Sequence, residues 1–304
     1  MNQRLSILVV VIIFLCTSSM FAFFTDNLKR AMETYDKEEF ITVNLILDDQ
    51  YNFNDLYKSV KHLPLDLRRE NTIITLKNHV ESTQNEVMEI LTHLSQNGLV
   101  KDIKSLWIIN ALNFRIANHA LSVFKDRTDI KYLDYDELKY MLNNLIPSES
   151  RETHYNNETQ NREITYNVTT VNAPQVWDLG YTGEGIIVSV IDSGVNYNHA
   201  DLQNNMWTHP DYPNHGFNFV NDSFNPSDDH SHGTHCAGTV AGNGASGSQT
   251  GMAPDAKIMA LKVLDNSGNG QESFTWNAVQ FSLENGARIM SISLGWHLSW
   301  GANR

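Results

Sequence analysis

The chain has 304 residues, of which 22 are Lys or Arg and 35 are Asp or Glu, so its formal net charge is −13. This acidity excludes nucleic acid as an expected partner, because phosphate binding requires clustered cations. Hydrophobic residues make up 41% of the sequence, which excludes disorder throughout, and the length suffices for two folded units.

The N-terminus predicts an export signal at residues 1–22. A positively charged residue precedes an apolar run at 5–16, and small residues follow it up to Ala22, near which we expect cleavage. The alternative is an uncleaved membrane anchor, because two phenylalanines after Ala22 extend the apolar stretch toward spanning length. Cleavage predicts a secreted, extracellular protein without membrane association, in which Cys236 is the one thiol and no internal disulfide forms.

The segment 25–140 alternates between strand and helix patterns and predicts a small α+β unit. Apolar residues recur at helical spacing from Val87 to Leu94, and Gly98 follows where the helix is expected to stop. Asn118 is expected to cap a second, short helix. Strands are expected at 41–47, 101–109, 112–116 and 130–133. This β-α-β-β-α-β order predicts one antiparallel sheet with helices on one face, a ferredoxin-like arrangement.

Residues 141–171 are expected to form an exposed linker that proteases cut easily. Asn, Glu, Ser and Thr dominate most of this stretch, and it shows little apolar periodicity. Asn157 and Asn167 begin matches to the N-glycosylation pattern, although such three-residue matches also arise by chance. The linker is therefore the expected region of a processing site.

An acidic residue follows a predicted buried strand at 186–191. The near-unbroken run of Ile and Val is typical of a strand covered on both faces of a parallel sheet, and ligands bind beyond the carboxyl ends of such strands. Asp192 stands at that end. The alternative is that Asp192 only caps the next turn, a usual role of Asp before Ser-Gly.

Three histidines, His230, His232 and His235, form a cluster with two alternative interpretations. In one, His232 begins a helix and acts with Asp192 as part of a Ser-His-Asp acyl-transfer site. His235 would then be a core histidine whose ring nitrogens are hydrogen-bonded, and His230 would be an exposed loop residue. In the other, the cluster holds zinc in a hydrolase. Thr234 stands where metallo-β-lactamase-like patterns have an acid, and further Cys or His ligands are not close by, so zinc is the remote alternative.

The rest of the second unit alternates between strand and helix. A strand is expected at 257–264, a helix at 272–284 and a strand at 287–294. This βαβ order predicts a parallel sheet. Residues 172–304 are therefore expected to form an α/β unit.

Six segments of this unit resemble subtilisin-type serine proteases, the subtilase family, in the family's own order. They are Asn-Ala-Pro-Gln-Val-Trp at 172–177, Gly-Tyr-Thr-Gly-Glu-Gly at 180–185, Asp-Ser-Gly at 192–194, His-Gly-Thr-His-Cys-Ala-Gly at 232–238, Gly-Met-Ala-Pro at 251–254 and Ser-Leu-Gly at 293–295. The resemblance implies a subtilisin-like doubly wound parallel sheet and a secreted serine endopeptidase made as a zymogen. It also implies that Asp192 orients the imidazole and that His232 is the general base.

The same resemblance implies two backbone walls of a peptide groove, although the first wall is also an ordinary turn. The first wall is formed by Gly268, Asn269 and Gly270, and the second wall by Ser293, Leu294 and Gly295. A protein or peptide substrate would add between them as an extended strand. The order of elements in 25–140 resembles the propeptide of subtilisin-like proteases, bacillopeptidase F most of all. Such a propeptide assists folding and inhibits its own protease until it is removed.

The resemblance implies no cofactor for the chemistry, although calcium is a candidate structural ion. The insert 201–229 is rich in Asp, and Asp201 aligns with a familiar calcium ligand position of the family. The alternative is a solvated acidic loop.

The 304 residues contain no segment of the Gly-Thr-Ser-Met-Ala or Gly-x-Ser-x-Gly type that would present a nucleophilic serine. An Asp-His pair alone forms no acyl-enzyme, so we expect this chain by itself to be inactive. We interpret it as a fragment whose parallel sheet ends in an unpaired edge strand, which predicts low stability. The alternatives are a propeptide-bearing module that inhibits a related protease or assists its folding, and an inactive pseudoprotease.

Overall fold

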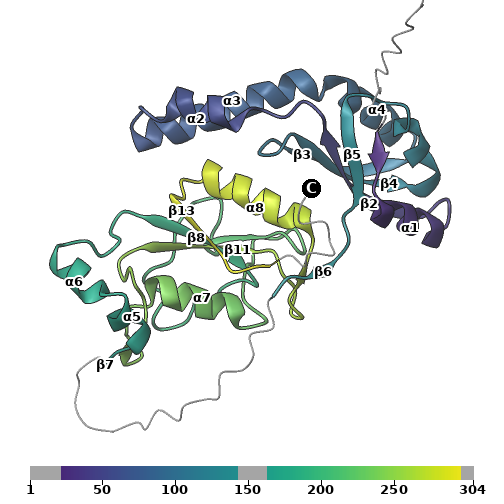
Figure 1. Ribbon diagram of the computed structural model, residues 1–304. Helices are drawn as coiled ribbons and strands as arrows, with labels where there is room; N and C mark the ends of the chain where they lie inside the picture. The colour runs from purple at the N-terminus through teal and green to yellow at the C-terminus, as the bar shows by residue number, and fades with distance from the viewer. Residues whose placement is uncertain (1–21, 143–162, 296–304) are drawn as a thin grey trace, which may run out of the picture.

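The computed structural model describes residues 22–142 and 163–295, which form two units (Figure 1). Except for Ala22, the predicted export signal lies outside the described residues. No helix within these two ranges is long and apolar enough to cross a membrane.

The first unit is built on a five-stranded sheet with the strand order β1-β5-β2-β4-β3. Its strands are β1 (Phe23–Phe24), β2 (Phe40–Leu47), β3 (Val100–Leu106), β4 (Ala111–Ala117) and β5 (Ile130–Tyr135). Neighbouring strands pair antiparallel except β1, which runs parallel to β5. The four predicted strands are present. Phe23 and Phe24, two of the residues that extend the apolar N-terminal stretch, form the edge strand β1.

Several helices accompany this sheet, and the sequence patterns predict only some of them. They are α1 (Asp26–Thr34), α2 (Phe53–Val60), α3 (Leu65–Thr83), α4 (Asn85–Gln96) and the 3₁₀ helix η1 (Asn118–Phe124). The sequence predicts α4 and η1, but α3 buries only Leu76 and Val80 along its 19 residues and so shows no apolar stripe. The capping prediction at Asn118 is wrong, because its side chain donates to the carbonyls of Met32 and Tyr35.

The second unit contains a parallel sheet with the strand order β13-β8-β11-β9. Its strands are β8 (Ile187–Asp192), β9 (Gly216–Asn218), β11 (Lys257–Lys262) and β13 (Ile289–Ile292). Strands β8, β11 and β13 confirm the predicted strands, although β8 is shifted by one residue, β11 ends two residues early and β13 covers only the middle of 287–294. The short strand β9 lies inside the acidic insert and is not predicted.

Two helices cover opposite faces of the parallel sheet. They are α7 (His232–Ala241) and α8 (Glu272–Glu284), and both begin where the sequence predicts. Val190 of β8 packs with Ala237 of α7. The next residue, Ile191, packs with Ala278 of α8, because successive strand residues point to opposite faces. The run of Ile and Val therefore marks a strand buried on both sides, as expected.

The linker prediction fails at both ends of 141–171. Met141 and Leu142 are buried. At the other end, β7 (Glu163–Ile164) pairs with β10 (Ser248–Gln249), and helix α5 (Tyr166–Thr170) buries Val168, before α6 (Ala173–Asp178). Residues 143–162, including the sequon at Asn157, lie outside the described residues.

Helix α8 lies between the two sheets, as Figure 1 shows. One face of the first unit's sheet packs on α4, through residues such as Phe114 and Leu91. The opposite face packs on α8, where Ile46 contacts Trp276. Polar contacts join the same surfaces, since the side chain of Gln280 accepts a hydrogen bond from the backbone N–H of Ile108 at 3.1 Å.

Candidate active site

The structure brings Asp192 and His232 together at the carboxyl end of β8. Asp192 is the last residue of β8 and is fully buried, whereas His232 is the first residue of α7 and its side chain is 20% exposed. Oδ1 of Asp192 lies 2.7 Å from Nδ1 of His232. When Nδ1–H donates to this carboxylate, Nε2 is the imidazole nitrogen that is able to accept a proton.

Asp192 also caps the turn after β8. The same oxygen, Oδ1, accepts a hydrogen bond from the backbone N–H of Ser193 at 2.7 Å. The other oxygen, Oδ2, is buried and has no hydrogen-bond partner within the described residues. The two interpretations of Asp192 are therefore compatible, because one carboxylate oxygen orients the imidazole and holds the turn.

A second acid, Asp228, fixes the start of α7 against this turn. Its carboxylate accepts hydrogen bonds from the hydroxyl of Ser193 at 2.9 Å and from the N–H and hydroxyl of Thr234 at 2.9 and 2.5 Å. Ser193 in turn accepts from the N–H of Gly233 at 2.9 Å. Burial raises the pKa of Asp228, but the donors from Thr234, His230 and Ser193 outweigh it and lower the pKa below its usual value.

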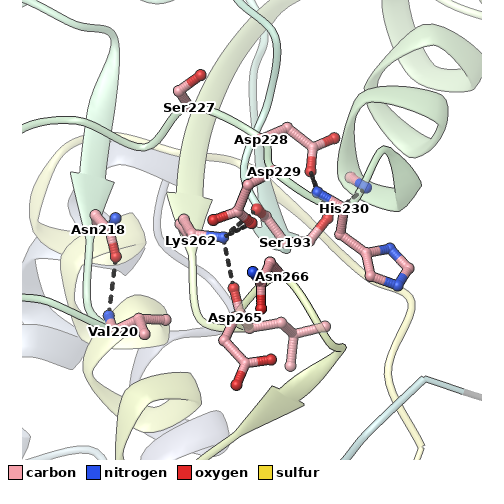
Figure 2. Close-up of polar contacts among 12 residues, drawn as sticks. Ser193, Asn218, Val220, Ser227, Asp228, Asp229, His230, Lys262, Asp265 and Asn266 are labelled. Atoms are coloured by element: carbon pink, nitrogen blue, oxygen red, sulfur yellow. Dashed lines mark hydrogen bonds and ion pairs between the residues drawn. The ribbon is translucent and has the colours of Figure 1, made fainter.

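Lys262 links the ends of β8 and β11 beside the Asp192–His232 pair. It lies opposite Asp192 in the β8–β11 register, and its buried ammonium donates to the carbonyls of Ser193 and Leu264, both at 2.7 Å. It also pairs with Asp229 at 2.6 Å. Figure 2 shows Lys262 between Ser193 and Asp229. The sequence analysis does not identify Lys262, although a lysine in the apolar strand 257–264 is a signal that could have revealed it.

Gly233 allows α7 to approach the end of β8. A Cβ atom at this position would lie 2.1 Å from the carbonyl oxygen of Gly194 and 3.1 Å from Cβ of Asp192. Only glycine fits such a close approach of two backbones. The glycine after His232 therefore has a direct geometric role in bringing the imidazole to the carboxylate.

The predicted environments of the other two histidines are wrong. His235 is exposed rather than in the core, because it projects from the outer face of α7. His230 is partly buried, and its Nδ1 has no hydrogen-bond partner among the described residues. The ring centres of His230 and His232 lie 6.4 Å apart.

The histidine cluster does not assemble as a zinc site. Within the described ranges, the group whose potential ligand atoms lie within 4.8 Å of one another is Asp192, His232 and Cys236. Neither His230 nor His235 belongs to it. Sγ of Cys236 lies 3.8 Å from Nδ1 of His232, and burial raises the pKa of this partly exposed thiol.

The acids of the 201–229 insert do not gather around one centre. Asp228 and Asp229 are engaged at the rim described above. Oδ1 of Asp201 accepts the backbone N–H of Ser246 at 2.6 Å, and Oδ2 lies 3.9 Å from Nδ1 of His199. Calcium requires about six to eight oxygen ligands, and among the described residues Asp201 belongs to no group of three or more acidic, His or Cys ligands within 4.8 Å of one another. These contacts do not fit a calcium ion at Asp201.

The two predicted groove walls lie on either side of a strand from the chain itself. Strand β6 (Lys139–Tyr140) pairs antiparallel with β12 (Asn269–Gly270). Met141 donates its N–H to the carbonyl of Gly268 at 3.0 Å, and its carbonyl accepts the N–H of Gly295 at 2.8 Å. Residues 139–142, hereafter the tail, therefore bridge the walls. The sequence analysis divides these residues between the first unit and the linker.

A cavity of about 530 Å³ lies beside the imidazole. It is lined by residues that include His232, Cys236, Val240, Ser293 and Leu294. The second wall thus borders both the tail and the space next to the proposed base. A peptide held between the walls would pass close to this cavity.

Comparison with known proteins adds an independent observation. Residues 183–302 match the model of the subtilase family. The minor extracellular protease Vpr of Bacillus subtilis (strain 168) is 40% identical over 134 residues, which are 41% of this chain and 16% of that protein. Subtilisin E of the same organism is 37% identical over 135 residues, 44% of this chain and 33% of its own length. Thermitase of Thermoactinomyces vulgaris is 37% identical over 132 residues, 43% of this chain and 44% of its own length. The chain thus spans less than half of each relative.

Proposed function

We propose that this chain, whose residues 183–302 belong to the subtilase family, carries the acid and the base of a Ser-His-Asp endopeptidase. The observation that supports this proposal most strongly is the 2.7 Å contact between the buried carboxylate of Asp192 and Nδ1 of His232. A fully buried carboxylate beside an imidazole that remains accessible is the arrangement that acyl transfer requires.

In this mechanism Asp192 orients the imidazole and stabilises the imidazolium that forms. Nε2 of His232 removes the proton from a serine hydroxyl as the hydroxyl attacks the substrate carbonyl. His232 then gives the proton to the leaving amine. The 304 residues present no serine in a nucleophile motif, so we assign the nucleophile and the oxyanion donors to polypeptide outside this sequence.

The proposed substrate is a protein or peptide bound as an extended strand. The tail illustrates this binding mode, because its main chain makes hydrogen bonds with both walls. Main-chain bonding of this kind gives affinity for any extended peptide, and side-chain pockets give selectivity. This proposal assigns substrate binding to the six wall residues at 268–270 and 293–295.

We further propose that the first unit is the inhibitory propeptide of a zymogen. Two observations support this role. Its four longer strands follow the order β5-β2-β4-β3 of a ferredoxin-like sheet, and its C-terminal tail occupies the proposed groove. Export is part of the proposal, and one of the relatives is named an extracellular protease. Calcium binding at Asp201 stays a prediction that the contacts of Asp201 do not support.

Sequencing the gene beyond codon 304 tests the proposal directly. An open frame that encodes a Gly-Thr-Ser block supports it. In the protein from that frame, we expect His232→Ala to lower the rate of peptide hydrolysis about 10⁴-fold or more. Full activity of this variant would contradict the role of His232.

The second candidate function is a protease inhibitor or folding-assistance module. The observation that favours it is the same occupied groove, since a docked tail resembles a bound substrate strand. A stop codon after Arg304, together with inhibition of a related subtilisin by the intact chain, would favour this candidate.

A further inference from the structure

The tail brings a lysine to the first groove wall. In the β6–β12 pairing, Lys139 lies opposite Gly270, and Glu272 follows two residues later as the first residue of α8. Nζ of Lys139 lies 3.1 Å from Oε1 of Glu272. The wall that binds the main chain of the tail therefore also supplies a carboxylate to its side chain.

The ion pair is largely buried, so the ammonium of Lys139 depends on a carboxylate partner. The side chain of Lys139 is 4% exposed and that of Glu272 is 20% exposed. A lysine is almost never this buried without a partner, because removing an ammonium from water is costly. Glu137 lies farther from the ammonium, at 3.8 Å, and belongs to the same unit as the tail. Glu272 is the acid that stays with the groove when the tail leaves.

The position of Glu272 at the start of α8 suits a negative charge. Glu272 lies in the first turn of α8, where the helix dipole favours a negative charge. Its neighbour Gln271 donates to the backbone carbonyl of Asp136 at 2.5 Å. The N–H of Ser273 points to the carboxylate of Asp136 at 3.4 Å. Asp136 of the first unit thus contacts the residues on both sides of Glu272 while the tail is docked.

We propose that Glu272 is a specificity-determining residue of the groove and selects a Lys or Arg side chain in the substrate. The selected position is the one that Lys139 holds, two residues before the residue whose main chain bridges Gly268 and Gly295. The favoured substrates are therefore peptides with a basic residue at this position. This inference rests on the proposed function of the groove.

Other ion pairs between the two units provide a matched control. Arg288 pairs with Asp66 at 2.8 Å, but the two side chains are 36% and 71% exposed and the pair lies away from the tail. Exposed pairs of this kind contribute little to stability. Reversing the charge of Arg288 therefore shows whether the loss of any ion pair between the two units is enough to weaken docking of the tail.

The first experiment measures tail docking in the intact chain by amide hydrogen exchange at Met141 and Gly295. We expect Lys139→Glu or Glu272→Lys alone to speed this exchange about 10-fold or more. The double variant Lys139→Glu/Glu272→Lys should recover most of the protection, and Arg288→Glu should leave it unchanged. Single variants without effect, or a double variant without recovery, would overturn the inference.

The second experiment measures selection among added peptides. It uses the intact chain with Met141→Asp, which frees the groove because the tail would otherwise bury a charge. The probes are the hexapeptide Glu-Leu-Lys-Tyr-Met-Leu, which matches residues 137–142, and its analogue with Met in place of Lys. Binding is followed by the backbone amide shifts of Gly270 and Gly295.

We expect the lysine peptide to bind about 10-fold tighter than its analogue, and Glu272→Gln to abolish this preference. If both peptides bind equally tightly and shift these amides, the role of Glu272 is wrong, whereas the proposed peptide groove is supported. If neither peptide shifts these amides, both the inference and the proposed groove are wrong.

Discussion

The ammonium group of Lys262 donates a 2.7 Å hydrogen bond to the carbonyl of Ser193, the residue directly after the buried acid. This contact connects the end of β11 to the end of β8, where the acid and the imidazole meet. The geometry of the pair thus depends on a buried cation that contacts neither side chain of the pair.

Replacing this cation is expected to destabilise the chain. Lys262→Met leaves two carbonyls and Asp229 without their donor, so the free energy of unfolding should fall by about 3 kcal/mol. Urea denaturation measures the change. The control is Lys257→Met on the same strand, whose exposed ammonium bonds only the carbonyl of Asn204, and it should change stability by about 0.5 kcal/mol or less. Equal losses in both variants would contradict the bracing role.

The close approach at Gly233 is also testable. Gly233→Ala places a methyl group 2.1 Å from the carbonyl oxygen of Gly194, so α7 must shift away from β8. We expect a loss of about 2 kcal/mol or more. Gly238→Ala is the control in the same helix, since its nearest atom would be 4.0 Å away. It should stabilise the chain by up to about 1 kcal/mol. Thermal unfolding distinguishes the two, and a stable Gly233→Ala variant would contradict the argument.

The orientation of the imidazole depends on the carboxylate of Asp192. In the native chain we expect the neutral imidazole of His232 to carry its proton on Nδ1, because Oδ1 of Asp192 accepts the hydrogen bond. Asp192→Asn should shift the ring toward the Nε2–H tautomer, which nitrogen-15 shifts of the ring report. Asp201→Asn should leave the tautomer unchanged. An unaltered ring in Asp192→Asn would show that the contact does not set the tautomer.

The stability of the chain should depend on Asp136 at mildly acidic pH. Burial raises the pKa of its carboxyl from 3.8 to about 6, although hydrogen bonds from Ser273 and Asn44 lower it. Between these two values the folded chain binds the proton more tightly than the unfolded chain does. This contribution is therefore most favourable below pH 3.8, declines as the pH rises to about 6, and is constant above.

The expected size of this decline is about 3 kcal/mol. It is measured as the difference in free energy of unfolding between the native chain and Asp136→Asn across this pH range. The difference should change by that amount between pH 4 and 7 and remain flat at higher pH. Parallel curves for the two proteins would contradict the raised pKa.

Some of this structure was predictable because short-range patterns encode it. The run of Ile and Val before Asp192 identifies a strand covered on both faces, and the acid falls at its carboxyl end. The helix α8 was predicted at its observed bounds from its position in a βαβ order. These features depend on residues that are close together in the sequence, so they can be predicted from it.

Other features depend on residues far apart in the sequence. The brace at Lys262 joins segments 69 residues apart, and a single lysine does not reveal which carbonyls it will reach. The helix α3 was not predicted because its apolar residues do not gather on one face, and its few buried residues pack with α2 and Trp107. His235 is exposed rather than in the core, and His230 is partly buried rather than exposed, because the orientation of α7 on the sheet decides which histidine faces solvent.

The amino-acid sequence by itself determined the family resemblance and the alternation of strands and helices, and it singled out Asp192 and His232 as the proposed acid and base. Tertiary structure alone decided that these two side chains meet at 2.7 Å, that residues 139–142 lie between the proposed groove walls, and that Glu272 meets Lys139. The physical reason is that periodicity and turn chemistry are local, whereas a buried contact exists only after distant segments have packed together.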